Sequence, residues 1–146
     1  MINHKASITI KKHAAEVFKF VATDYFINHP KWDSRVVELQ LASSGPMAIG
    51  TRGNETRKQG GRNVSYAFEV TDYQFNKLIA MKAKGGPAQF TATYAVARVA
   101  EGETRLDIEF NLSMGGLFRI MEPFMAGSFR KEVSGISSTI KQMLEA

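Results

Sequence analysis

Two stretches decide the fold: FTATYAVA at residues 90–97 and RLDIEFNL at residues 105–112. In both, a larger apolar residue alternates with a smaller or polar one, which is the period of a strand with one buried face. The same or a weaker period recurs at residues 37–41, 51–58, 66–71 and 78–83. The connections are too short for crossover helices, so the sequence predicts about six antiparallel strands.

Helical periodicity lies on the N-terminal side of these strands, after a short predicted strand at residues 7–10. Ala14, Val17, Phe18 and Val21 recur at i, i+3, i+4 and i+7, as on one face of an amphipathic helix. The pair His29-Pro30 then interrupts, because proline disfavours helical geometry in the residue before it. We therefore expect a second helix to be short and broken there, with His29 in a surface turn.

The last 30 residues return to helical period. One apolar stripe contains Met121, Met125, Phe129, Val133, Ile136, Ile140 and Met143, with Glu132 at its edge. Because proline is tolerated near a first helical turn, Pro123 predicts that the helix begins close to Glu122. The sequence thus predicts one α+β domain over residues 1–146, in which a curved antiparallel sheet of six to seven strands wraps around a long C-terminal helix. One or two short helices follow the first strand.

The residue inventory excludes several kinds of chemistry. The 146 residues contain no cysteine and only three histidines, His4, His13 and His29, so we predict no zinc or other metal site and no cofactor. There is no nucleophile elbow and no phosphate-binding glycine loop, and no catalytic residue is assigned. No apolar run approaches the roughly 20 residues of a membrane span, so we expect no membrane insertion and a cytoplasmic location.

The charge of +5 is unevenly placed. Residues 1–84 contain 13 basic and 7 acidic residues, whereas residues 85–146 contain 6 and 7. Acidic residues are interspersed, so we interpret the excess as a solvated surface and predict no specific nucleic-acid partner. The densest basic stretch spans residues 52–62. This strand lacks an apolar face, so its alternation leaves open whether Arg52 and Asn54 or Glu55 and Arg57 point inward. Whichever set is buried, its charged side chain would need a partner.

Several segments together resemble a known family. They are AAEVFKFV (14–21), NHPKW (28–32), GTR (50–52), EVT (69–71), GETRL (102–106) and KQMLE (141–145). In order and position they resemble the polyketide cyclase/dehydrase-type branch of the START-like, helix-grip superfamily (SRPBCC). The resemblance implies a deep, mostly apolar cavity between sheet and C-terminal helix, which holds polyketides, lipids or similar molecules in relatives. His13-Ala14 and Ser34-Arg35 depart from the pattern, since relatives often have proline there.

Aromatic and methionine side chains on the predicted inward faces are the candidate ligand-binding residues. They are Tyr66, Phe68, Phe90, Tyr94, Phe110, Met121, Met125 and Phe129. The alternative is that they fill a solid core with no room for a ligand. Buried tyrosines need hydrogen-bond partners and methionines adapt to varied apolar shapes, which favours a cavity. Glu132 is a further polar candidate, unless it faces solvent.

Three functions remain open. The first is a carrier or sensor that binds a hydrophobic small molecule, as a monomer or homodimer. The second is a cyclase, aromatase or dehydratase that acts by positioning a flexible substrate, without a metal or covalent nucleophile. The third is a protein-interaction module that uses the basic N-terminal half. The residues leave open which ligand, reaction or partner is involved.

Overall fold

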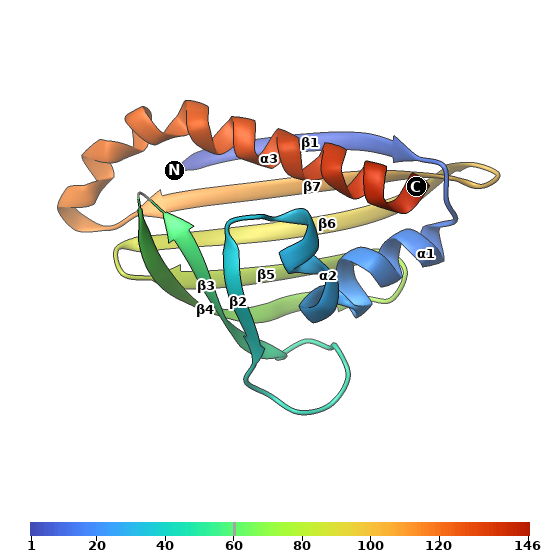
Figure 1. Ribbon diagram of the computed structural model, residues 1–146, viewed down its shortest axis with the longest axis horizontal. Coiled ribbons are helices and arrows are strands. Elements are labelled where there is room, and N and C mark those ends of the chain that lie inside the picture. The colour runs from blue at the N-terminus through green and yellow to red at the C-terminus, as the bar shows by residue number, and fades with distance from the viewer. Residues whose placement is uncertain (60) are drawn as a thin grey trace.

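Seven antiparallel strands form one curved sheet in the order β1-β7-β6-β5-β4-β3-β2 (Figure 1). The structure is a computed structural model that describes residues 1–59 and 61–146, so Gly60 of the turn predicted at Gly60-Gly61 lies outside the described residues. The strands are β1 (Ile2–Ile10), β2 (Val36–Leu41), β3 (Arg52–Gln59), β4 (Arg62–Gln74), β5 (Leu78–Gly85), β6 (Ala88–Ala100) and β7 (Glu103–Met114). The predicted fold class, a helix-grip α+β fold, is confirmed.

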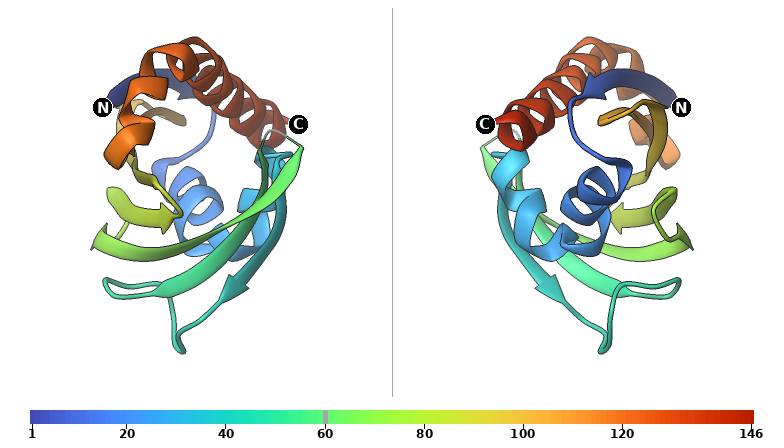
Figure 2. Two further views of the ribbon diagram at one scale, coloured as in Figure 1. Left: turned by 90° about the vertical axis from the view of Figure 1, so that its left-hand side faces the viewer. Right: turned by 90° about the vertical axis from the view of Figure 1, so that its right-hand side faces the viewer.

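Helices cover the concave face of this sheet. Between β1 and β2 lie α1 (Ala14–Phe18), the π-helical turn η1 (Lys19–Thr23) and α2 (Tyr25–Trp32), and after β7 come the 3₁₀ turn η2 (Gly116–Met121) and α3 (Glu122–Glu145). In Figure 2 the sheet curls into a cup, α3 lies across its open side, and α1 and α2 occupy the interior. The most deeply buried apolar side chains come from these facing layers: Ile10, Val17, Phe18, Val21, Val70, Ile79, Leu106, Ile108, Val133 and Ile140.

The strand alternation predicts burial well in the centre of the sheet and poorly at its edge. Tyr94 and Ile108 are 1% exposed, as their alternating stretches predict. In β2, however, Val37 is 55% and Leu41 49% exposed, so the prediction of burial is wrong for these two residues, whereas Leu39 packs against the core. β2 pairs only with β3 and has a register shift between Val36 and Glu38, which takes Val37 out of the regular alternation.

The predicted break at His29-Pro30 is also wrong. α2 continues through Pro30 to Trp32, and His29 is 4% exposed rather than in a surface turn. Tyr25, His29 and Trp32 follow the i, i+4, i+7 spacing of one helix face, and all three are buried. Pro30 removes one backbone donor near the end of this short helix, and burial of that face outweighs the loss.

α3 begins at Glu122, as predicted, with Pro123 in its first turn. Its inward stripe holds Val133, Ile136 and Ile140, all buried. Met121 does not belong to this stripe, because it lies in η2 and is 47% exposed. The prediction is therefore correct from Met125 onward and wrong for Met121.

Two glycines make room for aromatic rings on the neighbouring strand. Gly53 pairs with Phe68 across β3 and β4, and a Cβ there would lie 2.5 Å from the ring. A Cβ on Gly85 would lie 2.6 Å from the ring of Tyr66. Only glycine permits such close approach. The two rings therefore lie directly against these glycines, and Phe68 packs against Tyr25 and Phe26.

Candidate functional site

A small cavity of about 80 Å³ lies between the sheet, α2 and α3. Its apolar walls are formed by Phe90, Ala92, Tyr94, Phe110, Leu112, Phe129, Val133 and Ile136. Its polar walls are formed by Tyr25, His29, Asp33, Glu55, Arg57, Gln59, Tyr66 and Glu132. The cavity thus has an aromatic side and a charged side.

Strand pairing decides which residues of β3 reach the cavity. Glu55 pairs with Tyr66 and Arg57 pairs with Val64, and directly opposed residues lie on the same face of a sheet. Since Tyr66 faces inward, so do Glu55 and Arg57, which are 3% and 8% exposed. Of the two sets left open by the sequence, Glu55 and Arg57 point inward and Arg52 and Asn54 point outward.

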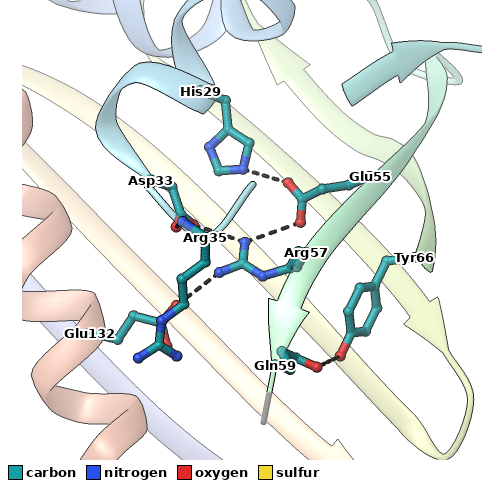
Figure 3. Close-up of polar contacts among 8 residues, drawn as sticks. All are labelled: His29, Asp33, Arg35, Glu55, Arg57, Gln59, Tyr66 and Glu132. Atoms are coloured by element: carbon teal, nitrogen blue, oxygen red, sulfur yellow. Dashed lines mark hydrogen bonds and ion pairs between the residues drawn. The ribbon is translucent and has the colours of Figure 1, made fainter. Parts of the chain in front are cut away.

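Arg57 is the centre of a buried ion cluster (Figure 3). Its Nη1 donates to Asp33 Oδ2 at 2.8 Å and to Glu55 Oε2 at 3.1 Å. Its Nη2 donates to Glu132 Oε1 at 2.8 Å, and Arg35 donates to the other oxygen of Glu132 at 2.8 Å. Strand β3, helix α3 and the end of α2 are thereby joined through one guanidinium group.

His29 extends the cluster toward α2. Its Nε2 lies 2.5 Å from Glu55 Oε1, so Nε2 carries a proton and donates it to the carboxylate. The ring stacks on Tyr25 with centroids 4.5 Å apart. Nδ1 is buried and has no hydrogen-bond partner among the described residues, which is unusual, since buried polar atoms are nearly always paired.

The carboxylates of the cluster outnumber its guanidinium groups. Asp33, Glu55 and Glu132 supply three carboxylates, whereas Arg57 and Arg35 supply two guanidinium groups. The three carboxylates therefore need one further proton or cationic group, beyond the two guanidinium groups, for full neutralisation.

The environment of the cluster shifts the pKa values of Glu55 and Glu132 in opposite directions. Burial alone would raise the pKa of Glu55, but the hydrogen bond and charge of His29, together with Arg57, lower it below its ordinary value. Burial raises the pKa of Glu132, and Arg57 and Arg35 only partly oppose this effect. Burial would lower the pKa of Arg57, but the neighbouring carboxylates raise it, so this guanidinium group stays charged.

Three tyrosines of the cavity lining, Tyr25, Tyr66 and Tyr94, carry hydroxyl groups. Tyr66 donates its hydroxyl proton to Gln59 Oε1 at 2.7 Å. Burial raises the pKa of Tyr25, Tyr66 and Tyr94, and the nearby Glu55 adds to the effect on each. All three phenols therefore remain protonated at neutral pH and can serve as hydrogen-bond donors.

The structure brings five of the eight predicted binding residues together. Those that line the cavity are Tyr66, Phe90, Tyr94, Phe110 and Phe129. Phe68 is buried beside the cavity against Tyr25, while Met125 is partly buried and Met121 exposed outside the lining. Glu132 lines the cavity as well.

Sequence reasoning missed His29 and Asp33 as cavity residues. The signal for His29 was the helical spacing of Tyr25, His29 and Trp32, which the proline obscured. Asp33 follows α2 directly, and no local pattern distinguishes it from a surface residue. Its buried position depends on Arg57, 24 residues further along the chain.

The cavity is smaller than the resemblance implies. Pockets for drug-sized ligands measure about 300–1,000 Å³, so 80 Å³ accommodates only a small group without side-chain movement. A more open depression of about 630 Å³ lies over β4–β7 and is lined mainly by outward residues such as Lys82, Lys84, Gln89 and Thr91. These side chains are exposed, and the depression lacks a cluster of buried polar groups.

Metal binding and membrane spanning find no support in the described parts of the chain. Across residues 1–59 and 61–146, no three His, Asp or Glu side chains are grouped so that they could hold a metal ion. Nor does any helix in that part of the chain have the length and apolar character to cross a bilayer.

Nearly the whole chain is similar to known proteins. Residues 1–142 match the family model described as polyketide cyclase/dehydrase and lipid transport. A search of curated proteins finds no match. Among solved structures, a protein of Thermus thermophilus is 12% identical, with a TM-score of 0.77 over 97% of this chain and 96% of that one.

Two further structures carry descriptive names. The Zhui aromatase/cyclase of a Streptomyces species is 9% identical, with a TM-score of 0.74 over 97% of this chain and 94% of that one. A START superfamily protein of Mycobacterium smegmatis is 11% identical, with a TM-score of 0.75 over 98% and 97%. At these identities the similarity establishes the shared fold.

Proposed function

Because the chain belongs to the polyketide cyclase/dehydrase and lipid-transport family, we propose that it binds a small ring-bearing apolar molecule through one hydroxyl or amine group. The observation that carries this proposal is the two-sided cavity. Phe90, Phe110 and Phe129 form its aromatic side, while Glu55 and Glu132 contribute carboxylates to the other.

The surplus of carboxylates supports a preference among polar groups. A carboxylate on the ligand would add a fourth carboxylate to a cluster that has only two guanidinium groups. A hydroxyl or ammonium group would instead donate to a carboxylate oxygen, and a buried polar group is stable only when it is paired. We therefore expect neutral donors or cations to bind more tightly than anions.

The cavity is so small that its walls must move apart when a ligand with a ring binds. Phe110 and Phe129 meet edge to face with centroids 6.4 Å apart, and both are only partly buried. They join β7 to α3 at the side of the cavity where the walls are apolar. Rotation of these rings would enlarge the cavity without breaking the ion cluster, and a ligand ring would replace the lost contact.

The test uses p-cresol as the probe and side-chain NMR as the readout. Ala92→Leu adds volume to the cavity wall, because Ala92 is 2% exposed and lines the cavity. The matched control is Ala97→Leu on the outward face of the same strand. We expect Ala92→Leu to weaken p-cresol binding at least about tenfold and Ala97→Leu to leave it unchanged. Equal binding by both variants would contradict the proposal.

A second candidate function is acid–base catalysis of a dehydration. It is favoured by the pKa shifts within one cluster, since the pKa of Glu55 is lowered and that of Glu132 is raised. Such a difference allows one carboxylate to act as a base and the other to act as an acid. Glu132 would protonate a departing hydroxyl group while Glu55, paired with His29, accepts a proton from the adjacent carbon; the products are an alkene and water.

An aryl β-hydroxyketone, 4-hydroxy-4-phenylbutan-2-one, tests this candidate, because its enone product absorbs in the ultraviolet. Enone formation by the wild type, and its loss in Glu132→Gln with p-cresol binding retained, would support catalysis. Equal rates with and without protein would leave binding as the function.

A further inference from the structure

Five large apolar side chains are exposed within eight consecutive residues where η2 meets α3. Their exposed fractions are 89% for Leu117, 51% for Phe118, 76% for Ile120, 47% for Met121 and 88% for Phe124. Elsewhere in the described residues, large exposed apolar side chains such as Ile27, Ile49 and Phe75 are far apart in sequence. Single exposed apolar residues are normal, whereas a contiguous group marks an interaction surface.

The helical geometry aligns these side chains. A 3₁₀ helix repeats every three residues and an α-helix every 3.6, so Leu117, Ile120 and Phe124 form one row. They are also the three most exposed of the group. In Figure 1 this segment forms the orange turns at the far left end of the molecule, beyond the ends of the strands. The row therefore lies on a convex tip.

The charge around the tip has one sign. Arg119, Arg130 and Lys131 are exposed, whereas Glu122 is the only acidic residue between positions 115 and 131. Glu122 is buried and accepts a hydrogen bond from the backbone N–H of Met114 at 3.2 Å. The exposed part of the segment thus combines apolar side chains with cationic groups alone.

We propose that residues 117–124, the apolar tip, dock this protein on an anionic lipid bilayer, with the row of Leu117, Ile120 and Phe124 in the interfacial layer. The neighbouring Arg119, Arg130 and Lys131 would contact the acidic headgroups. Apolar side chains beside basic ones are the composition that binds such surfaces. The chain would lie on the membrane without crossing it.

A second copy of the chain fits this tip less well than a bilayer. A stable interface uses about 20–30 residues on each side, and the tip provides eight. In a two-fold dimer the same patch meets itself, so the cations of one copy would face those of the other. An anionic bilayer has no such repulsion. This inference does not depend on the proposed ligand, because the tip lies outside the cavity lining.

The test is sedimentation of the purified protein with vesicles. We expect binding to phosphatidylcholine vesicles that contain phosphatidylglycerol, weaker binding to phosphatidylcholine alone, and a decrease as salt is raised. The double variant Leu117→Ser/Phe124→Ser should bind at least about tenfold more weakly. Arg119→Gln should weaken binding to anionic vesicles about fivefold. Ile49→Ser, at another exposed apolar residue, is the matched control and should bind as the wild type does.

Three results would overturn the proposal. One is a wild-type protein that does not bind anionic vesicles. Another is a double variant that binds as strongly as the wild type or no more weakly than the Ile49→Ser control. The third is a dimer seen by light scattering that Leu117→Ser/Phe124→Ser dissociates while vesicle binding is absent, which would identify a second copy as the occupant. Unchanged p-cresol binding in the double variant keeps this test separate from that of the cavity.

Discussion

The ion cluster and the apolar tip depart from the usual placement of residues in opposite ways, because the cluster buries charged side chains and the tip exposes apolar ones. At the cluster, Arg57 and Glu55 are buried among aromatic walls. At the tip, Leu117 and Phe124 are almost fully exposed beside cationic groups. Both lie along α3, since Glu132 follows Phe124 by eight residues, or about 12 Å of helix. Each placement lowers the stability or solubility of the isolated protein, so each points to a binding partner that compensates.

The two regions differ in how many contacts their side chains make with the rest of the protein. Every charged group of the cluster has a protein partner, and removal of one leaves others uncompensated. The exposed side chains of the tip have few neighbours to lose. The cluster should therefore be sensitive to substitution through stability, whereas the tip should be sensitive only through interaction. The predictions below separate these behaviours, from the largest expected effect to the smallest.

Arg57→Met should destabilise the protein by about 3–5 kcal/mol, because it leaves the carboxylates of Asp33, Glu55 and Glu132 without their shared cation. Arg35→Met is the matched control. Its side chain is 47% exposed and pairs with Glu132 alone among the carboxylates of the cluster, so its loss should cost less than about 1 kcal/mol. Denaturant unfolding measures both, and equal effects would show that burial of the cluster contributes little.

The pH dependence of stability should differ in sign between the two glutamates. The folded pKa of Glu132 is raised, so its contribution is fully present below the ordinary glutamate pKa and is lost as pH rises through the raised value. The folded pKa of Glu55 is lowered, so its contribution is present above the ordinary pKa and is lost as pH falls through the lowered value.

Unfolding of Glu132→Gln and Glu55→Gln across the acidic range measures this difference. As pH rises through this range, Glu132→Gln should gain stability relative to the wild type, and Glu55→Gln should lose it. Slopes of the same sign for the two variants would contradict the assignment of opposite pKa shifts.

The smallest effect is expected at the tip. Leu117→Ser/Phe124→Ser should change the free energy of unfolding by no more than about 0.5 kcal/mol for each residue, because both side chains are exposed. Thermal unfolding in the absence of lipid checks this. A large loss of stability would mean that these side chains pack against the protein in solution, and the contrast with the cluster would fail.

The centre of the fold could be predicted from the sequence because its periodicity is strong. Tyr94 and Ile108 lie in alternating stretches, and Val133 and Ile136 lie in a helical one, so burial follows from period alone. β2 could not be predicted in this way. Val37 and Leu41 have the same alternation but lie at an edge, where no second layer covers them.

The inward set on β3 could not be chosen from that strand alone, because charged and polar residues occupy both of its faces. The deciding information lies in the hairpin. Gln59 pairs with Arg62, so only two residues separate the paired positions in sequence, and so short a separation fixes the register of a hairpin. That register assigns Glu55 to the same face as Tyr66. The inward position of Glu55 and Arg57 could thus have been predicted from the hairpin turn. The exposure of residues 117–124, in contrast, depends on how α3 packs, and no local sequence pattern predicts it.

The central claim is that the surplus of carboxylates over guanidinium groups in the buried cluster selects the polar group of the ligand. The most direct test compares the dissociation constants of p-cresol and p-toluate, which share one ring and methyl group and differ in the polar substituent. The account predicts that p-cresol binds in the cavity at least about tenfold more tightly. Equal affinity, or tighter binding of p-toluate at the same site, would contradict it.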